Sequence, residues 1–359
     1  MKVFISDCEG PLSKNDNAFE TTAHFVPNGG KLFAVISKYD DVLADVLKRP
    51  GHRAGATLKL VLPFLKAYEV TDHEMGEFSA RDLLLIPDVK NTLHHVRSIT
   101  QAFIVSTSYE HYIKALCQAV GFPFENTYCT RLSIDKYRTT EKEKTKLKCI
   151  AEEIARMQIL EIPPNAESLD DLPEADQKVI RRLDEIFCKE IAEMESGKFY
   201  SEINPVGGSE KAEAIRDIVN KVRARLSDVM YVGDSITDEE AFRLVKKNKG
   251  LAVSFNGNQY AVNNAEIAVM SENSAVTAVI ADVFVKLGKQ ETLNLLENWN
   301  HRALEKSQVS QTLLTLLFKL YPRRLPKVKI ITSKNVETLA KESSEFRKRV
   351  RGKTIGRLG

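Results

Sequence analysis

The sequence has few of the features that mark membrane, disulfide-bonded or nucleic-acid-binding proteins. Its 359 residues contain five cysteines, an odd number without close pairs, which argues against a disulfide framework and against a zinc site. The best apolar run, around 313–320, is broken by Lys319 and does not reach the length of a bilayer span. A formal net charge of +3 is too small for this length to indicate nucleic-acid binding. These absences favour a reducing compartment, with no membrane and no nucleic acid as partners.

One part of the chain differs from the rest in charge. Residues 322–359 contain twelve Lys or Arg against three Glu, a net +9, so the total of +3 leaves −6 for the remainder. A basic tail on a mildly acidic body indicates either a surface for a protein partner or a solvated helix face, and the second is the commoner case.

Short apolar runs alternate with helical periods over much of the chain, which predicts a doubly wound parallel α/β sheet. In such sheets ligands bind at the carboxyl ends of the strands. The strands are expected at 2–6, 102–105, 127–134, 228–232, 251–255 and 267–269. Helices are expected at 87–96, 110–120, 210–225 and 238–246.

Two helical stretches interrupt this alternation, and a third follows it. The expected organisation is an α/β core at 1–13, 83–135 and 201–290, a helical cap insertion at 14–82, a second helical insertion at 136–200 and a helical, basic C-terminal extension at 291–359. Breaks inside the insertions are expected at 49–51 (Arg-Pro-Gly) and 163–165 (Pro-Pro-Asn).

The first strand ends in a carboxylate pair, Asp7 and Glu9, followed by Gly10. A carboxylate such as Asp7 can attack phosphorus and form an acyl phosphate. Glu9, two positions on, can protonate the leaving oxygen and later activate water. The backbone N–H groups of the turn at Cys8 and Gly10 can bind phosphoryl oxygens. The plainer alternatives are a capped strand-to-turn junction without chemistry and, for Cys8, a buried structural thiol.

Two later segments supply groups that bind phosphoryl oxygens. Ser106 follows the strand at 102–105 and offers a hydroxyl, and Thr107 beside it could serve as well. Lys211 opens a helix after Gly207 and Gly208 and offers an ammonium. Taken alone, Ser106 is more typical of a helix N-cap than of a phosphate-binding residue, and Lys211 is more typical of a solvated helix lysine.

A second carboxylate pair follows the strand at 228–232. Asp234 and Asp238, with Asp7 and Glu9, are hard oxygen ligands suited to Mg²⁺, which would offset the repulsion between a carboxylate and a phosphate. Asp238 can also cap the helix that follows it. Because every candidate stands at the end of a strand or the start of a helix, we expect all of them to converge on one edge of the sheet.

The four segments at 4–10, 103–106, 207–211 and 230–238 resemble the signature motifs of the haloacid dehalogenase superfamily, whose members are mostly phosphatases. The resemblance covers roughly 1–13, 83–132 and 202–285. It implies a nucleophile at Asp7, an acid/base at Glu9, phosphate binding by Ser106 and Lys211, and Mg²⁺ as cofactor at the carboxylates of the first and fourth motifs. The whole chain also resembles archaeal members described as energy-converting hydrogenase subunits.

Glu9 departs from the family pattern, in which the residue two positions after the nucleophile is usually Asp. The extra methylene moves the carboxyl by about one bond length, which matters for an acid that must reach a leaving oxygen at hydrogen-bond distance. The Asp-x-Glu-Gly form is similar to that of the enolase-phosphatases, and it argues against a dehalogenase.

The expected function is therefore Mg²⁺-dependent hydrolysis of a small phosphorylated metabolite through an aspartyl-phosphate at Asp7. Two alternatives stay open: a binding or regulatory subunit that contacts a protein partner through the basic tail, and a phosphotransferase that uses the same residues. A cleaved leader is not expected, because cleavage would remove Asp7 together with its strand. The expected location is the cytoplasm.

Overall fold

A seven-stranded sheet forms the centre of the computed structural model, which describes residues 1–50, 52–163 and 166–357. The strand order is β3-β2-β1-β4-β5-β6-β7, and every neighbouring pair is parallel except β6 and β7. The strands are β1 (Val3–Ser6), β2 (Gln101–Tyr109), β3 (Thr127–Thr130), β4 (Val229–Gly233), β5 (Leu251–Phe255), β6 (Ile267–Met270) and β7 (Lys327–Ile330). The expected doubly wound core is confirmed, and the strand order reverses at β1.

Helices cover both faces of the sheet because alternate strand residues point to opposite sides. Met230 and Val232 of β4 belong to the hydrophobic cluster on one face, whereas Val229 and Tyr231 belong to the cluster on the other. The first face packs against α5 (Val89–Ile99), α6 (Glu110–Val120) and α13 (Ala275–Glu297). The second face packs against α10 (Ser209–Lys221), α11 (Glu239–Lys247) and α12 (Gln259–Asn264).

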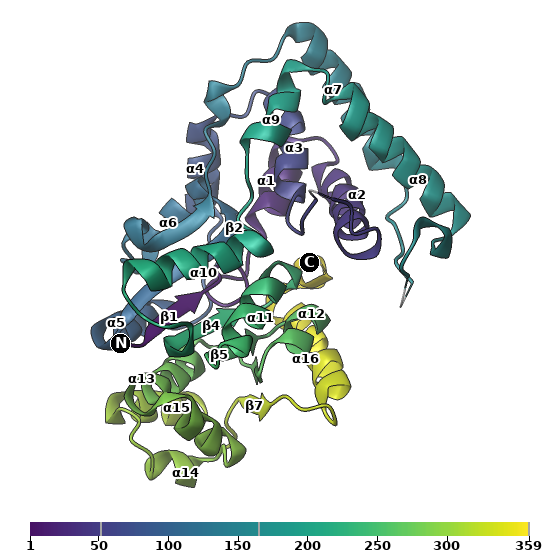
Figure 1. Ribbon diagram of the computed structural model, residues 1–359. Coiled ribbons are helices and arrows are strands. Elements are labelled where there is room, and N and C mark those ends of the chain that lie inside the picture. The colour runs from purple at the N-terminus through teal and green to yellow at the C-terminus, as the bar shows by residue number, and fades with distance from the viewer. Residues whose placement is uncertain (51, 164–165, 358–359) are drawn as a thin grey trace.

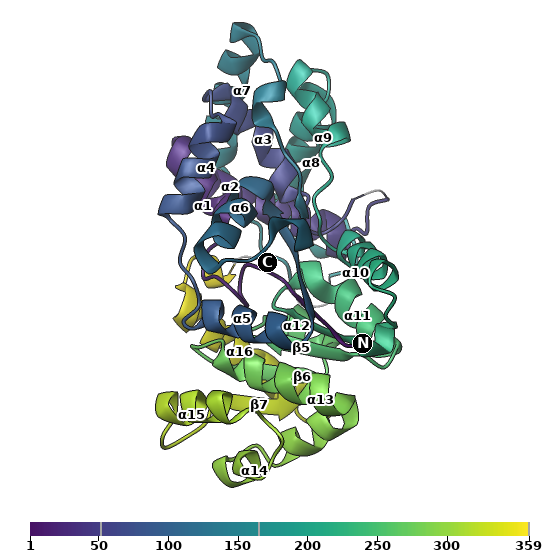
Figure 2. The same cartoon turned by 90° about the vertical axis from the view of Figure 1, so that its left-hand side faces the viewer.

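The two helical insertions form a single cap with one hydrophobic core. Tyr39 of the first insertion stacks on Phe187 of the second with their ring centroids 5.6 Å apart, and Arg49 pairs with Asp184 at 2.7 Å. The first insertion supplies α1 (Asn17–Phe25), α2 (Gly29–Asp41), α3 (Thr57–Ala67) and α4 (Asp72–Arg81). The second supplies α7 (Glu141–Arg156), α8 (Glu174–Glu185) and α9 (Lys198–Glu202). Figures 1 and 2 show this cap as the lobe on one side of the sheet, away from α13.

The C-terminal extension folds back onto the core. It is mostly helical, as expected, with α14 (His301–Glu305), α15 (Gln311–Leu320) and α16 (Val336–Arg351). It also contributes β7, which the sequence reasoning did not predict and which pairs antiparallel with β6. Leu339 and Ala340 of α16 pack on Val262 of α12. The last residue of the helix, Arg351, donates hydrogen bonds to the backbone carbonyls of Lys14 and Asn15, where the first insertion leaves the core.

Most expected elements form with shifted ends. The helix at 110–120 and the strand at 251–255 have the expected bounds, whereas β2 runs four residues beyond 105 and β3 ends at Thr130 rather than at 134. The expected breaks at 49–51 and 163–165 fall partly outside the described residues. Within the part of the chain that the structure describes, no helix combines the length and the apolar character needed to cross a membrane.

Candidate active site

The register of the central strands brings three of the four sequence segments together. Ser6, the last residue of β1, is level with Ile104 of β2 on one side and Val232 of β4 on the other. Ser6 ends β1 and Gly233 ends β4 at this edge of the sheet, whereas β2 continues to Tyr109. Asp7, Ser106 and Asp234 all line one cavity there, Asp7 and Asp234 from just beyond their strands and Ser106 from within β2.

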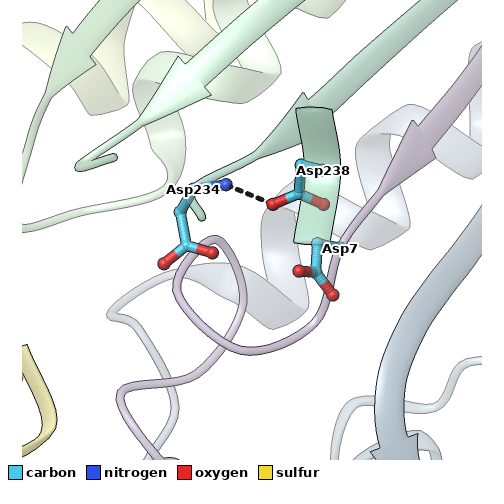
Figure 3. Close-up of side chains that lie close together, drawn as sticks. All are labelled: Asp7, Asp234 and Asp238. Carbon is cyan, nitrogen blue, oxygen red and sulfur yellow. Dashed lines mark hydrogen bonds between the residues drawn. The ribbon is translucent and has the colours of Figure 1, made fainter. Parts of the chain in front are cut away.

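Three carboxylates meet at this edge (Figure 3). One oxygen each of Asp7, Asp234 and Asp238 can be chosen so that all lie within 4.8 Å of one another, and all three residues are buried. The backbone N–H of Asp234 donates to Asp238 Oδ2 at 2.8 Å, which fixes the Asp238 carboxylate relative to the Asp234 backbone. Three hard oxygen donors at this spacing fit a magnesium ion.

Lys211 joins two of these carboxylates. Its Nζ donates to Asp7 Oδ2 at 2.6 Å and to Asp238 Oδ1 at 2.7 Å, and the side chain is fully buried, so it is not a solvated lysine. The Tyr231 hydroxyl donates to the same Asp238 oxygen at 2.6 Å. Burial raises the pKa of Asp7 to about 6, even though the charge of Lys211 acts to lower it. The lysine thus holds the nucleophile candidate and a metal-ligand candidate in one network.

The turn after β1 is fixed by Gly10. Its φ is +101°, and an added Cβ would overlap the Asp234 carboxylate, so only glycine lets the two motifs approach this closely. Its N–H donates to the Ser13 carbonyl at 2.8 Å, and the Cys8 N–H donates to Asp7 Oδ1 at 2.6 Å. Both donors expected to bind phosphate therefore already have partners within the turn. The Cys8 side chain is buried in a hydrophobic cluster, and burial raises the pKa of its thiol.

The hydroxyls of the second motif lie on β2 itself. Ser106 lines the cavity, and its Oγ is 3.0 Å from that of Ser108. It does not cap the next helix, because the N-cap position of α6 is occupied by Tyr109. Thr107 also lines the cavity, and its hydroxyl donates to the Val206 carbonyl at 3.0 Å, which ties the second motif to the loop before Lys211.

Glu9 lines the same cavity but is not one of the three clustered carboxylates. Its Oε1 accepts a hydrogen bond from the Asn17 N–H at 2.8 Å, at the first residue of α1. Burial, followed by the negative charge of Asp16, raises the pKa of Glu9 well above its usual range. Glu9 therefore lies in the same cavity as the nucleophile candidate but outside the group of three carboxylates that could hold a metal ion.

The cap closes over the site through the loop before α3. Asp40 of α2 accepts hydrogen bonds from the backbone N–H of Thr57 at 2.8 Å and from its hydroxyl at 2.7 Å. At Gly55, φ is +94° and an added Cβ would lie 2.9 Å from the Thr107 side chain, so the loop rests directly on the second motif. A partly open cavity with a volume of about 100 Å³ lies here between the core and the cap.

Two arginines that the sequence reasoning missed enter the site from α16. Arg347 and Arg351 line the cavity with exposed fractions of 3% and 8%, and the Nη1 atoms of both contact Asp234 Oδ2. A signal was present in the sequence, because Leu339, Ser343, Arg347 and Arg351 recur at intervals of four and so share one face of the helix. The buried face of α16 thus begins apolar and ends in two cations.

An acidic cluster beside the cavity predicts a pH-dependent stability. Burial raises the pKa of Glu20 to about 7 from an ordinary 4.5, with Asp16 and Asp82 adding to the shift and Arg351 and a hydrogen bond from Asn15 opposing it. A carboxyl whose folded-state pKa is raised stabilises the fold below its unfolded pKa and loses that contribution as the pH rises through the folded value.

Glu20→Gln should therefore flatten the fall in unfolding free energy between pH 5 and pH 8. We expect the variant to gain about 1–3 kcal/mol over the native protein at pH 8, after allowance for partial solvent exposure. Urea unfolding at both pH values measures this difference, and Glu174→Gln on the exposed side of α8 is the control. Parallel pH dependences of the native protein and Glu20→Gln would contradict the assignment.

With the fold and the site described, the comparisons define the class of protein as a hydrolase of α/β architecture. The family model of haloacid dehalogenase-like hydrolases matches residues 85–282, more than half of the chain. The chain belongs to this family, as the four motifs indicated. Asp7 and α16 lie outside the matched residues. No protein of curated function matches the sequence.

A solved structure of low sequence identity shares the fold of this chain. The structure of gene product AF1437 from Archaeoglobus fulgidus is 24% identical, covers 100% of this chain and 99% of its own length, and has a TM-score of 0.80. An apo phosphoserine phosphatase is 13% identical over 76% of this chain and 94% of its own, with a TM-score of 0.42. A phospho-aspartyl intermediate analogue of phosphoserine phosphatase is 12% identical over the same shares, with a TM-score of 0.44. The resemblance to hydrogenase subunits stays a prediction.

Proposed function

We propose that this protein is a magnesium-dependent phosphatase that hydrolyses a small phosphomonoester through an aspartyl-phosphate at Asp7. The observation that carries the proposal is the buried group formed by Asp7, Asp234 and Asp238, with Lys211 bonded to two of its members. Clustered carboxylates bridged by a buried lysine are costly to assemble for stability alone, because the desolvation of the charges offsets much of their attraction. Such a cluster is typical of a site that binds a metal and an anion.

Each residue has a role in this proposal. Asp7 Oδ attacks phosphorus, and the bond to the leaving oxygen breaks as the acyl phosphate forms. Glu9 donates a proton to the leaving oxygen and later takes one from the attacking water. Ser106 and Lys211 hold the phosphoryl oxygens. A magnesium ion at Asp7, Asp234 and Asp238 would supply positive charge that lets a carboxylate and a phosphate approach.

The substrate is proposed to be small. Cap helices α2 and α3 form part of the wall of the cavity of about 100 Å³, with Phe33 and Leu58 among its lining residues. A folded protein substrate could not reach Asp7 beneath this cap, whereas a phosphorylated metabolite could enter when the cap moves away. Water would be excluded on closure, which strengthens the electrostatic contacts to the phosphoryl group.

Hydrolysis of an aryl phosphate tests the proposal through its metal requirement. The protein is first stripped with a chelator, and turnover is then measured with and without added Mg²⁺. We expect turnover to depend on Mg²⁺ and to return when the ion is restored. Activity that is indifferent to chelation would contradict the proposed role of the three carboxylates.

The same assay separates hydrolysis from two other proposals. A phosphotransferase would form a phosphorylated product when an alcohol acceptor is added, at the expense of inorganic phosphate. A binding or regulatory subunit would bind Mg²⁺ and phosphate without turnover. For the subunit, the partner surface would lie on exposed cations of the basic segment, such as Arg323, Arg324 and Lys341, because Arg347 and Arg351 are buried.

A further inference from the structure

The end of α16 brings two positive charges onto a proposed metal ligand. Arg351 Nη1 lies 3.1 Å from Asp234 Oδ2, and Arg347 Nη1 contacts the same oxygen as well as the Asp234 backbone carbonyl at 3.3 Å. Arg351 also donates from Nε to the Lys14 carbonyl at 3.0 Å and from Nη2 to the Asn15 carbonyl. The guanidinium of Arg351 is thus anchored to the turn after β1, and that of Arg347 contacts both the carboxylate and the backbone carbonyl of Asp234.

Buried guanidinium groups need anionic partners, since an uncompensated buried charge is strongly unfavourable. Both arginines are more than nine-tenths buried, and both converge on one carboxylate oxygen. Burial and the neighbouring Arg351 lower the pKa of Arg347, so its charge relies on the acidic groups around it. The Asp234 carboxylate is therefore bound by two arginines and is at the same time one of the three carboxylates that could hold a metal ion.

Asp7, Asp234 and Asp238 face three cations, Lys211, Arg347 and Arg351. Glu9 and Asp16 also line the cavity, so carboxyl groups outnumber the cations before any ligand enters. A divalent ion at the carboxylates draws on the charge of Asp234 and adds two positive charges. The Asp234 oxygen that both arginines contact is then shared with the ion, and the arginines, which line the cavity together with Ser106, are available to an anion there.

We propose that Arg347 and Arg351 form an additional anion-binding pair of the active site, which Asp234 holds until a divalent ion binds and which then receives an anionic group of the substrate. The inference rests on the proposed function, because it requires a metal at Asp234. Two linked effects follow. The arginines weaken metal binding, since they compete for Asp234, and they strengthen anion binding once the metal is present.

Metal affinity is the first readout. Mn²⁺ binding, followed by electron paramagnetic resonance in the absence of any anion, should be about tenfold tighter in Arg347→Met than in the native protein, because a competing cation has been removed. Arg349→Met is the matched control, since Arg349 lies on the same helix but is exposed, with its Nε 3.8 Å from Glu272. Mn²⁺ binding that is unchanged or weaker in Arg347→Met overturns the inference, because it would make the arginine a support of Asp234 rather than a competitor.

Anion affinity is the second readout. In the presence of saturating Mn²⁺, calorimetry with inorganic phosphate, ethyl phosphate and 2-phosphoglycolate should show binding about tenfold weaker in Arg347→Met than in the native protein. Equal losses for all three ligands would place the phosphoryl group at the arginines. A loss confined to 2-phosphoglycolate would place a second acidic group of the substrate there. If Arg347→Met binds all three ligands as tightly as the native protein does, the inference is overturned.

A measurement on the native protein covers the case in which the variant does not fold. Hydrogen exchange of the α16 amides at 343–351 should become faster when Mn²⁺ is added alone and slower again when phosphate follows. Faster exchange would report that the arginines of α16 have lost their contacts with Asp234. Slower exchange with Mn²⁺ alone would contradict the inference. If the native protein and all variants bind no Mn²⁺, the proposed function fails, whereas metal binding without these shifts overturns this inference alone.

Discussion

Replacing Asp7 by Asn is expected to lower the turnover of an aryl phosphate by about 10⁴-fold or more, because an amide cannot form the acyl phosphate. The substitution keeps the size of the side chain and the oxygen that accepts from the Cys8 N–H. It removes the oxygen that pairs with Lys211, so a modest loss of stability should accompany the loss of activity. Steady-state kinetics at saturating Mg²⁺ measures the first effect, and thermal unfolding the second.

Trapping the intermediate makes this prediction sharper. Acid quenching of the native protein during turnover of a labelled phosphomonoester should leave label on the chain that mild base releases, as an acyl phosphate requires. The Asp7→Asn variant should carry none. Asp170→Asn, at an exposed position of the cap, is the matched control and should behave as the native protein does. A variant at Asp7 that keeps most of the native rate would rule out this residue as the nucleophile.

Replacing Lys211 by Met is expected to lower the unfolding free energy of the metal-free protein by about 3–5 kcal/mol. The lysine is fully buried and bonded to Asp7 and Asp238, so its loss leaves two carboxylates facing each other without a cation. Denaturant unfolding measures the loss. Lys221→Met, at the exposed end of the same helix, should change stability by no more than about 0.5 kcal/mol.

The cause of this destabilisation can be tested without further variants. If it arises from the two carboxylates, the loss should shrink at low pH, where they are protonated, and it should shrink when Mg²⁺ binds the native state. A deficit that is the same at low and neutral pH, with and without the ion, would point to lost packing of the lysine stem instead.

The sequence carried most of the information needed for the core of the site. Asp7, Ser106 and Asp234 each follow an apolar run, and parallel strands make such positions neighbours once the register is set. The Glu9 and Lys211 positions could be predicted from local pattern as well. None of these inferences needed the order of the strands, because a doubly wound sheet gathers all its carboxyl ends on one side.

What could not be predicted depends on contacts between distant segments. The apolar faces of α2 and α7 show that each helix is partly buried, but not that both share one core. The short Lys-Val-Lys-Ile run of β7 alternates as an edge strand does, yet only the open edge of β6 decides its pairing. Arg347 and Arg351 look like surface cations until Asp234 and, for Arg351, the turn at Lys14 and Asn15 lie against them.

The bonds from Arg351 to Lys14 and Asn15 span 337 and 336 positions of the chain. Contacts of such separation form late, since the intervening loop must be closed before they add any stability. During synthesis, β1 and the cap can begin to fold while α16 is still on the ribosome. A nascent chain would then carry Asp234 before the two arginines that contact it in the folded protein have been placed.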